Sequence, residues 1–156
     1  MLIRRADPGD ASGIAAVHVS AIRQLCASVY EPGQIESWVS GKRAEHYLAP
    51  IARNPFFVAI SGTNIVGFSE LDAETGEVRA VYVHPDHVRQ HVGTRLLLTV
   101  EAAARERPLA RLHLHASLNA VPFYEAQSYI FDGEASVALE DGTLLPCIAM
   151  HKHLDR

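Results

Sequence analysis

The sequence predicts a mixed α/β fold of the α+β type, with a central, mostly antiparallel mixed sheet of about seven strands and helices on both faces. Two observations support this prediction. Apolar residues recur at helical spacing in some segments and at every second position in others, which separates helices from strands. Along the chain these segments follow the order β-α-α-β-β-β-α-β-α-β-β, and short polar turns between successive strands favour antiparallel pairing.

Helices are expected to dominate the first third of the chain. A short strand over 2–5 is followed by Asp-Pro-Gly-Asp at 7–10, which suits a helix start because proline fits the first turn and acids favour the N-terminus. Apolar residues at helical spacing continue this helix to about Ala27. A second helical region over 32–51, either continuous or broken at Gly41, ends before the Asn-Pro pair at 54–55.

The rest of the chain predicts most of the sheet. Turn sequences at 61–64 and around Gly76 separate three strands, and Pro108 ends the helix that follows them. A hairpin is expected around Asp141-Gly142. The expected elements are strands over 56–60, 65–71 and 78–83, a helix over 92–106, a strand over 111–116, a short helix over 119–127, and strands over 129–139 and 143–153.

The length and composition of the chain favour an ordinary globular protein. With 156 residues it is long enough to bury a proper core, and we expect a single domain over residues 1–156. A formal charge of −4 disfavours a nucleic-acid partner. The sequence has neither an apolar run long enough for a membrane span nor a signal-peptide pattern, so we expect a cytoplasmic protein without a membrane partner.

The segment from Val81 to Leu98 carries most of the functional information. It reads as an apolar strand, a turn containing Pro85, a basic loop with one glycine, and then an amphipathic helix. At such a helix N-terminus, unpaired backbone N–H groups and the positive end of the helix dipole face the same point. This segment is therefore a candidate binding site for phosphate groups.

The same segment, with the block from Asn119 to Tyr129, resembles the GNAT N-acetyltransferase superfamily, and the resemblance covers essentially the whole chain. In that family a strand ending like Val-Tyr-Val-His-Pro-Asp at 81–86 leads into a Q/R-x-x-G-x-G/A loop and a helix. Gly93 takes the second glycine position here, whereas His91 takes the first and Val88 takes the leading Gln/Arg position. The resemblance implies a small bacterial-type member with the GNAT fold.

The resemblance also implies an enzyme that moves an acetyl group from acetyl-CoA to a primary amine by direct attack in a ternary complex. The acetyl-CoA would lie between the strands that end at Val83 and Ala116, and Asn119 would meet its pantetheine arm and cap the following helix. Backbone N–H groups would bind the pyrophosphate, so we expect binding to persist although His91 adopts a positive φ less easily than glycine. The cofactor-binding candidates are Val81, Tyr82, Val83, Arg89, Gln90, His91, Val92, Gly93, Thr94, Asn119 and Phe123.

Three residues are candidates for proton transfer. Tyr124 matches the family tyrosine that donates a proton to the leaving sulfur, although it could equally be a packing aromatic. Glu70 is a candidate general base, because burial raises the pKa of an acid that shares an apolar strand face with Val66 and Phe68. Glu77 competes with it, since some relatives carry a base at this place, and a water chain without a dedicated base is the remaining option.

The acceptor-binding candidates come from two parts of the chain. Tyr30 and Trp38 belong to a pattern that resembles a Y-x-P/G-x-Q-I-x-x-W helix of small bacterial GNAT proteins, and they either cover the acceptor pocket or pack in the core. His115, at a strand end near the expected thioester, could assist the acceptor. A small-molecule amine is the default acceptor, because the acidic chain shows no preference for basic peptides. The terminal strands could also pair in a homodimer.

Two other functions are compatible with the sequence. The His-x-His pairs at 113–115 and 151–153 would each share a strand face and could bind zinc, but no cysteine or carboxylate completes a ligand set, so we expect no metal. The two cysteines, Cys26 and Cys147, are expected as buried apolar residues. Alternatively, the same fold could be a non-catalytic acyl-CoA-binding or sensor domain, because fold alone does not determine function.

Overall fold

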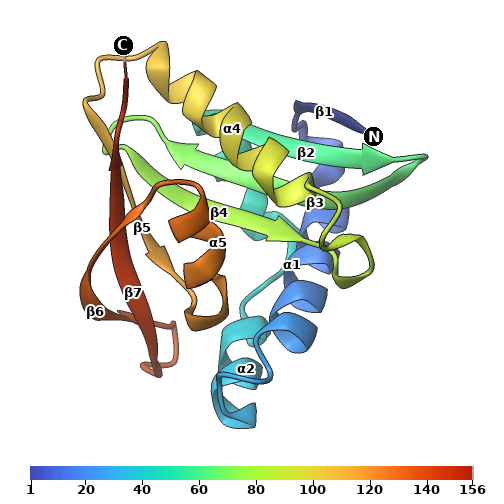
Figure 1. The fold of residues 1–156 in the computed structure, drawn as a ribbon. Coiled ribbons are helices and arrows are strands. Elements are labelled where there is room, and N and C mark those ends of the chain that lie inside the picture. The colour runs from blue at the N-terminus through green and yellow to red at the C-terminus, as the bar shows by residue number, and fades with distance from the viewer. Residues whose placement is uncertain (156) are drawn as a thin grey trace.

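The strands of the protein form one sheet of seven strands in the computed structural model, which describes residues 1–155 (Figure 1). They are β1 (Leu2–Arg5), β2 (Phe56–Ser61), β3 (Asn64–Asp72), β4 (Glu77–Val83), β5 (Arg111–Ala116), β6 (Ile130–Ala138) and β7 (Leu144–His153). Their order in the sheet is β1-β2-β3-β4-β5-β7-β6. Neighbouring strands are antiparallel except β4 and β5, which are parallel. The predicted mixed, mostly antiparallel sheet is confirmed.

Helices cover both faces of this sheet, as predicted (Figure 1). They are α1 (Ala11–Leu25), α2 (Pro32–Ser40), α3 (Leu48–Arg53), α4 (Val92–Arg105) and α5 (Val121–Ala126). On one face, Leu97 of α4 and Tyr124 of α5 join a core with residues of β5 and β7. On the other face, Ile14 of α1 and Ile51 of α3 meet Phe56 of β2. α2 packs against α1.

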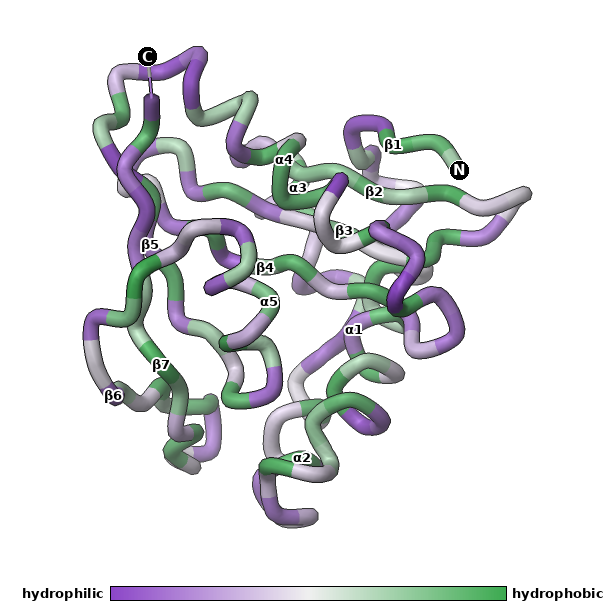
Figure 2. Tube along the Cα trace, in the orientation of Figure 1, coloured by the Kyte–Doolittle hydropathy of each residue, from purple (hydrophilic) through white to green (hydrophobic). Residues whose placement is uncertain are grey.

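The hydrophobic pattern of the central strands explains why both faces are covered. Figure 2 shows hydrophobic stretches along these strands and a largely hydrophilic loop between β4 and α4. In β2, Val58 packs on the α1 side and Ala59 packs on the α4 side, and both are fully buried. Burial of each large apolar side chain stabilises the fold by about 1.5–3 kcal/mol, so a strand with two apolar faces requires a helix on each.

The helical region expected over 32–51 is not continuous. α2 ends at Gly41, Arg43 is extended with φ −117° and ψ 154°, and a 3-10 turn covers Ala44–Tyr47 before α3 begins. Glycine inside a helix costs about 1 kcal/mol relative to alanine, which favours an end at this point. The break turns the chain back toward the sheet, where Tyr47 is buried against Phe68.

A β-bulge in β4 determines which side chains of this strand face which side of the sheet. Ala80 pairs with Glu70 of β3 while Val78 pairs with Leu71, so Arg79 is an extra residue. Val78 consequently packs in the α4-side core and Ala80 in the α1-side core. Because of the bulge, the side chains of the first residues of β4 lie on the sides of the sheet opposite to those expected for a regular strand.

A second bulge, in β3, corrects one expectation about Glu70. The register between β2 and β3 shifts at Val66, which is left as an extra residue and packs beneath α4 with Leu96. Phe68 and Glu70 face the opposite side, toward α1 and α3. The expected shared face of Glu70 and Val66 is therefore wrong, because counting every second residue fails across a bulge.

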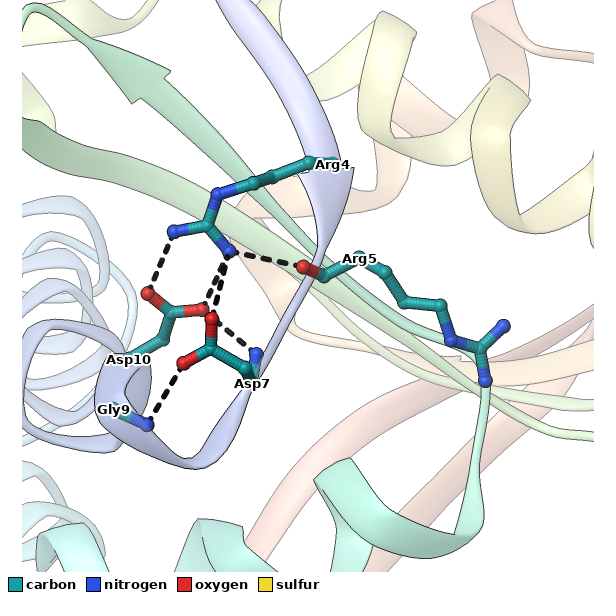
Figure 3. A network of polar contacts seen from close by, with 5 residues as sticks. All are labelled: Arg4, Arg5, Asp7, Gly9 and Asp10. Atoms are coloured by element: carbon teal, nitrogen blue, oxygen red, sulfur yellow. Dashed lines mark hydrogen bonds and ion pairs between the residues drawn. The ribbon is translucent and has the colours of Figure 1, made fainter.

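Polar contacts fix the start of α1 against β1 (Figure 3). Arg4 donates two hydrogen bonds to the Asp10 carboxylate, at 2.8 and 2.9 Å, and the Asp7 N–H donates a third at 2.8 Å. Asp7 in turn accepts a hydrogen bond from the Gly9 N–H at 2.9 Å. The hydrogen bonds from Arg4 hold the pKa of Asp10 below its usual range. This network anchors α1, one wall of the site described below.

Candidate active site

A cleft of 490 Å³ lies where the parallel strands β4 and β5 separate. These strands are in register at Glu77 and His113, near the start of β4, and they diverge beyond this pair. The end of β4, the C-terminal end of α1 and the segment leading into α5 form the walls of this central cleft. The cofactor-binding candidates that line it are Val81, Tyr82, Val83, Arg89, Gly93, Asn119 and Phe123.

A pocket of 300 Å³ adjoins the central cleft at the loop between β4 and α4. The central cleft and this loop pocket share the lining residues Val83, Val88, Arg89, Gly93 and Phe123. The loop pocket adds the candidates His91, Val92 and Thr94. Gln90 is not among the described residues that line either space.

The N-terminus of α4 offers free backbone donors beside the loop pocket. The first hydrogen bond of this helix runs from the Arg95 N–H to the His91 carbonyl at 3.1 Å. The N–H groups of Val92, Gly93 and Thr94 precede this bond and therefore have no acceptor within the helix. Together with the positive end of the helix dipole, they favour a bound phosphate.

Two residues of this loop adopt the left-handed backbone conformation. The φ angle is 63° at both Arg89 and His91. His91 was expected to take a positive φ less easily than the glycine it replaces, yet it does so, at a cost of about 1–2 kcal/mol. Histidine is among the residues enriched in this region. The turn into α4 thus persists without the first glycine of the family pattern.

Gly93 lies at the start of α4, against α5 and the end of β4. Its φ is not positive, so backbone freedom does not explain the glycine. A Cβ atom at this position would lie 3.4 Å from Cε1 of Phe123 and 3.5 Å from Cγ2 of Val83. These are ordinary van der Waals distances, so neither backbone conformation nor close packing requires a glycine at position 93.

A second cavity, of 340 Å³, adjoins the central cleft. This side cavity shares Tyr82 and Ser117 with the cleft, so the two spaces meet at these residues. Three acceptor candidates and one base candidate line it, namely Tyr30, Trp38, His115 and Glu77. The fold thus gathers residues from the α1–α2 segment, α2, β4 and β5 around one space.

Glu77 and His115 form the polar centre of the side cavity. The Glu77 Oε2 atom lies 3.8 Å from Nδ1 of His115, and their side chains are 31% and 41% exposed. The bulge at Arg79 places Glu77 on the same side of β4 as Tyr82, whereas a regular strand would place it with Val81. This geometry brings a carboxylate to the place where the two spaces meet.

Glu70 does not line the side cavity or the central cleft within the described part of the chain. It is buried, and its carboxylate accepts a hydrogen bond from Nδ2 of Asn54 at 2.7 Å. Burial raises the pKa of Glu70, although Asn54 and Arg79 act in the opposite sense. Its Oε2 atom lies 3.7 Å from Nε of Arg79, so Glu70 acts on the cavity through that arginine.

Tyr30 and Trp38 pack in the core and also line the side cavity. Both are buried, and their rings meet edge to face with centroids 5.5 Å apart. The Tyr30 hydroxyl donates a hydrogen bond to the Pro146 carbonyl at 2.6 Å and accepts one from the Leu118 N–H at 3.1 Å. Both rings also line the side cavity, so the same packing shapes its wall.

Comparison with known proteins identifies the family. Residues 26–150 match the acetyltransferase (GNAT) domain, which is well over half of the chain. The chain belongs to the GNAT acetyltransferase family. It is accordingly an acetyl-CoA-dependent N-acetyltransferase, and the resemblance noted in the sequence is confirmed.

Several relatives support this assignment. YafP of Escherichia coli (strain K12), an uncharacterized N-acetyltransferase, is 26% identical over 127 residues, which cover 81% of this chain and 79% of that protein. Spermidine N(1)-acetyltransferase of Thermoplasma acidophilum is 30% identical over 108 residues, 62% of this chain and 66% of that protein. The crystal structure of a GCN5-related N-acetyltransferase from Rhodopseudomonas palustris is 30% identical in sequence and superposes with a TM-score of 0.91. The match covers 98% of this chain and 95% of the Rhodopseudomonas chain.

The residues at the central cleft fit acetyl-CoA as the co-substrate of this acetyltransferase. The strand edges of β4 and β5 separate beyond Glu77 and His113, which leaves backbone donors and acceptors free for the amides of a pantetheine arm. The free N–H groups at the start of α4 suit the pyrophosphate. The apolar walls of the cleft, which include Val81 and Phe123, suit the aliphatic parts of the arm.

Tyr124, the expected acid of the acetyltransferase, is buried beside the central cleft. It packs between Phe123, which lines the cleft, and Tyr129, with ring centroids 5.1 and 5.6 Å away. Burial raises the pKa of Tyr124, so the phenol keeps its proton. Burial also raises the pKa of Tyr82, and Cys26 and Tyr124 raise it further.

Asn119 does not cap α5, contrary to expectation. Ala120 is the N-cap residue of α5, and its own N–H donates to the Ser117 carbonyl at 2.9 Å. The Asn119 Oδ1 atom instead accepts a weak hydrogen bond from the Cys26 thiol at 3.4 Å. Burial raises the pKa of this thiol to about 11, so it stays protonated and links the end of α1 to the segment before α5.

Among the residues that line the two spaces and were not site candidates are His18, Lys42, Arg79 and Ser117, whose side chains are polar or charged. Ser117 directly follows β5, a position that could have indicated it, because ligands gather at the carboxyl ends of parallel strands. The other three carried no such signal. A bulge, a helix break and the packing of α1 bring them to the cavity, and each of these depends on tertiary contacts.

The zinc and membrane alternatives gain no support within residues 1–155. There, no three His, Cys, Asp or Glu side chains are grouped to hold a metal ion. His151, one of the paired histidines, instead makes a 2.7 Å hydrogen bond with Asp132. In the same part of the chain, no helix has both the length and the apolar character that a membrane crossing requires.

Proposed function

We propose that this acetyltransferase transfers the acetyl group from acetyl-CoA to a primary amine of a small molecule by direct attack in a ternary complex. One observation carries this proposal: the central cleft and the side cavity meet at Tyr82 and Ser117. Two substrates bound in these spaces would have their reacting ends side by side, which favours a direct reaction between them.

Glu77 is the proposed general base. It lines the side cavity near the junction, and it is partly exposed, so a water molecule or an amine can reach its carboxylate. His115 lies 3.8 Å away and can orient that carboxylate. Glu70, which is bound to Asn54 behind the cavity wall, is less suited to this role.

Tyr124 is the proposed acid. As the bond between the acetyl carbon and sulfur breaks and the bond to nitrogen forms, the amine loses a proton to Glu77 and the sulfur gains one from Tyr124. Because burial raises the pKa of Tyr124, its phenol is a weak acid and donates only as the sulfur gains charge. Burial of the sulfur in the same cleft would raise its own pKa and so reduce this mismatch.

The proposal is tested by measuring acetyl-CoA turnover over a panel of small primary amines, with Tyr124→Phe measured in parallel. The panel includes spermidine, because that amine is named for the Thermoplasma relative. Turnover of at least one amine, greatly reduced in the variant, would support the proposal. Tight coenzyme A binding without turnover of any amine would instead support an acyl-CoA sensor.

A single domain, a homodimer and a cytoplasmic location stay predictions from the sequence.

A further inference from the structure

Two cationic side chains line the side cavity that also contains Glu77. Lys42 comes from the loop after α2, and Arg79 is the extra residue of the β4 bulge. Burial lowers the pKa of Lys42, the exposed Glu140 raises it, and Arg79 lowers it again. Because both side chains line the same cavity, their two positive charges favour an anion there.

Among the described residues, Lys42 has no ion pair, and Arg79 has one, with Glu70. Lys42 makes no salt bridge with a carboxylate among residues 1–155, and Glu140 acts on it from a distance. The ion pair of Arg79 joins its Nε atom to Oε2 of Glu70 at 3.7 Å. Because Asn54 holds Glu70 in place, this contact steadies the arginine and leaves its two terminal nitrogens available to a ligand.

A buried histidine adds an unused polar atom to the same wall. His18 lines the side cavity, and its Nε2 atom is buried without a hydrogen-bond partner. Its Nδ1 atom lies 2.8 Å from the Tyr47 hydroxyl. Burial lowers the pKa of His18 well below its usual range, and Lys42 lowers it further, so the ring is neutral. When Nδ1 accepts from Tyr47, Nε2 carries the proton of the neutral ring and is a donor.

We propose that Lys42 and Arg79 bind a carboxylate of the acceptor, so that the acceptor is an amino acid or a similar small amine that carries a carboxylate. This inference rests on the proposed acetyltransferase function and narrows its substrate class. The guanidinium of Arg79 can bind a carboxylate through two parallel hydrogen bonds, and Lys42 adds a second charge. The amino group of the acceptor would then lie toward Glu77, which is on the same strand as Arg79. A polyamine would bring further positive charge to this wall, which disfavours it.

Matched substrates test the proposal directly. We would compare each amino acid with the amine that its decarboxylation gives, such as leucine with isoamylamine, phenylalanine with phenethylamine, and lysine with cadaverine. The kcat/KM for acetyl transfer is expected to be at least tenfold higher for the acids. Arg79→Gln and Lys42→Met should each lower kcat/KM roughly 10- to 100-fold for the acids, mainly through KM, because each removes a charge-assisted hydrogen bond. The same variants should change kcat/KM for the decarboxylated amines by less than about threefold.

Two further variants separate a binding role from a general effect of charge. Arg43→Gln removes a positive charge next to Lys42 in the sequence, but Arg43 is exposed and does not line the side cavity among the described residues, so this variant should behave as wild type. Arg79→Lys keeps the charge and should recover part of the loss in KM. Thermal unfolding of each variant shows whether the fold is retained.

The outcomes distinguish this inference from the proposed function. The carboxylate site is refuted if the decarboxylated amines are acetylated with the same kcat/KM as the acids, or if the variants lower kcat/KM equally for both classes. The acetyltransferase function stands in either case. If no compound is acetylated, calorimetric titration of the amino acids into the protein with coenzyme A shows whether the carboxylate site binds them. Binding that is lost in Arg79→Gln and Lys42→Met would support the carboxylate site without the proposed reaction, and absence of binding would refute both.

Discussion

The Oε2 atom of Glu77 lies 3.8 Å from Nδ1 of His115, on two parallel strands that separate immediately beyond these residues. This pair stands at the side cavity, next to the junction with the central cleft. A carboxylate and an imidazole at this distance can pass a proton through one water molecule or a small adjustment of either side chain. The relationship leads to the first prediction.

Replacement of Glu77 by glutamine is expected to lower kcat about 100- to 10,000-fold, because general-base catalysis contributes an effect of this size. The KM for acetyl-CoA should change little, since Glu77 does not line the central cleft. Steady-state kinetics with a good amine acceptor measures both constants. Glu74→Gln, an exposed acid in the turn before β4, is the matched control. An equal loss of kcat in the two variants would show that kcat depends on the overall negative charge of this region and not on Glu77 in particular.

Replacement of Tyr124 by phenylalanine is expected to reduce kcat about 100-fold or more while the protein remains folded. The ring keeps its contacts with Phe123 and Tyr129, and the hydroxyl makes no hydrogen bond that the fold requires among the described residues. Because burial raises the pKa of Tyr124, wild-type activity should not fall through ionisation of this phenol up to about pH 10. A pH–rate profile of both proteins checks this. Unchanged kcat in the variant would leave Tyr124 with a packing role.

Replacement of His91 by glycine is expected to give a protein about 1 kcal/mol more stable than replacement by alanine. Both variants lose the imidazole, but alanine keeps the Cβ atom that strains a backbone with φ 63°. Glycine removes this strain, although it also gains flexibility in the unfolded chain. Urea unfolding of the two variants measures the difference. If alanine is as stable as glycine, the left-handed turn before α4 is not strained.

The affinity for coenzyme A should be similar in these two His91 variants. The donors expected to bind the pyrophosphate are backbone N–H groups at the start of α4, and neither substitution removes them. Calorimetric titration of coenzyme A into each variant tests this point. A large loss of affinity in both variants would show that the imidazole itself contacts the phosphates.

Replacement of Asp10 by asparagine is expected to lower the free energy of unfolding by about 1–3 kcal/mol at pH 7, because Arg4 loses its charged partner. Arg4 holds the pKa of Asp10 below its unfolded value, so this contribution is present above about pH 4 and is lost as pH falls through the folded pKa. Denaturant unfolding at pH 7 and pH 3 should therefore show the two proteins converging at the lower pH. A difference that is independent of pH would assign the loss to packing.

Local patterns in the sequence were sufficient to predict the order of elements. The proline-containing starts of α1 and α2, the polar turns of the β2–β4 region and the arginine-proline stop after α4 each act within a few residues. Most of the cofactor-binding candidates that the resemblance indicated line the central cleft or the loop pocket. His91 adopts the positive φ that glycine would take more easily, because a loop held at both ends can impose a conformation that its sequence disfavours.

The directions in which individual side chains point were harder to predict from the sequence. Counting every second residue placed Glu70 with Val66, but the bulge in β3 separates them. Asn119 looked like a helix cap, yet the backbone of Ala120 closes that turn and Asn119 meets Cys26 across the site. In each case a contact between distant parts of the chain overrides the local preference.

The sequence by itself determined the fold class and the family, and it singled out the segment from Val81 to Leu98 as the candidate phosphate-binding end of the site. The tertiary structure decided which acid serves the side cavity and which cations accompany it. The extra residue Arg79 turns Glu77 toward the space shared with Tyr82 and leaves Glu70 behind the wall. A bulge forms only when two strands pair, so the side on which Glu77 lies is a property of the β3–β4 register and could not be read from either strand alone.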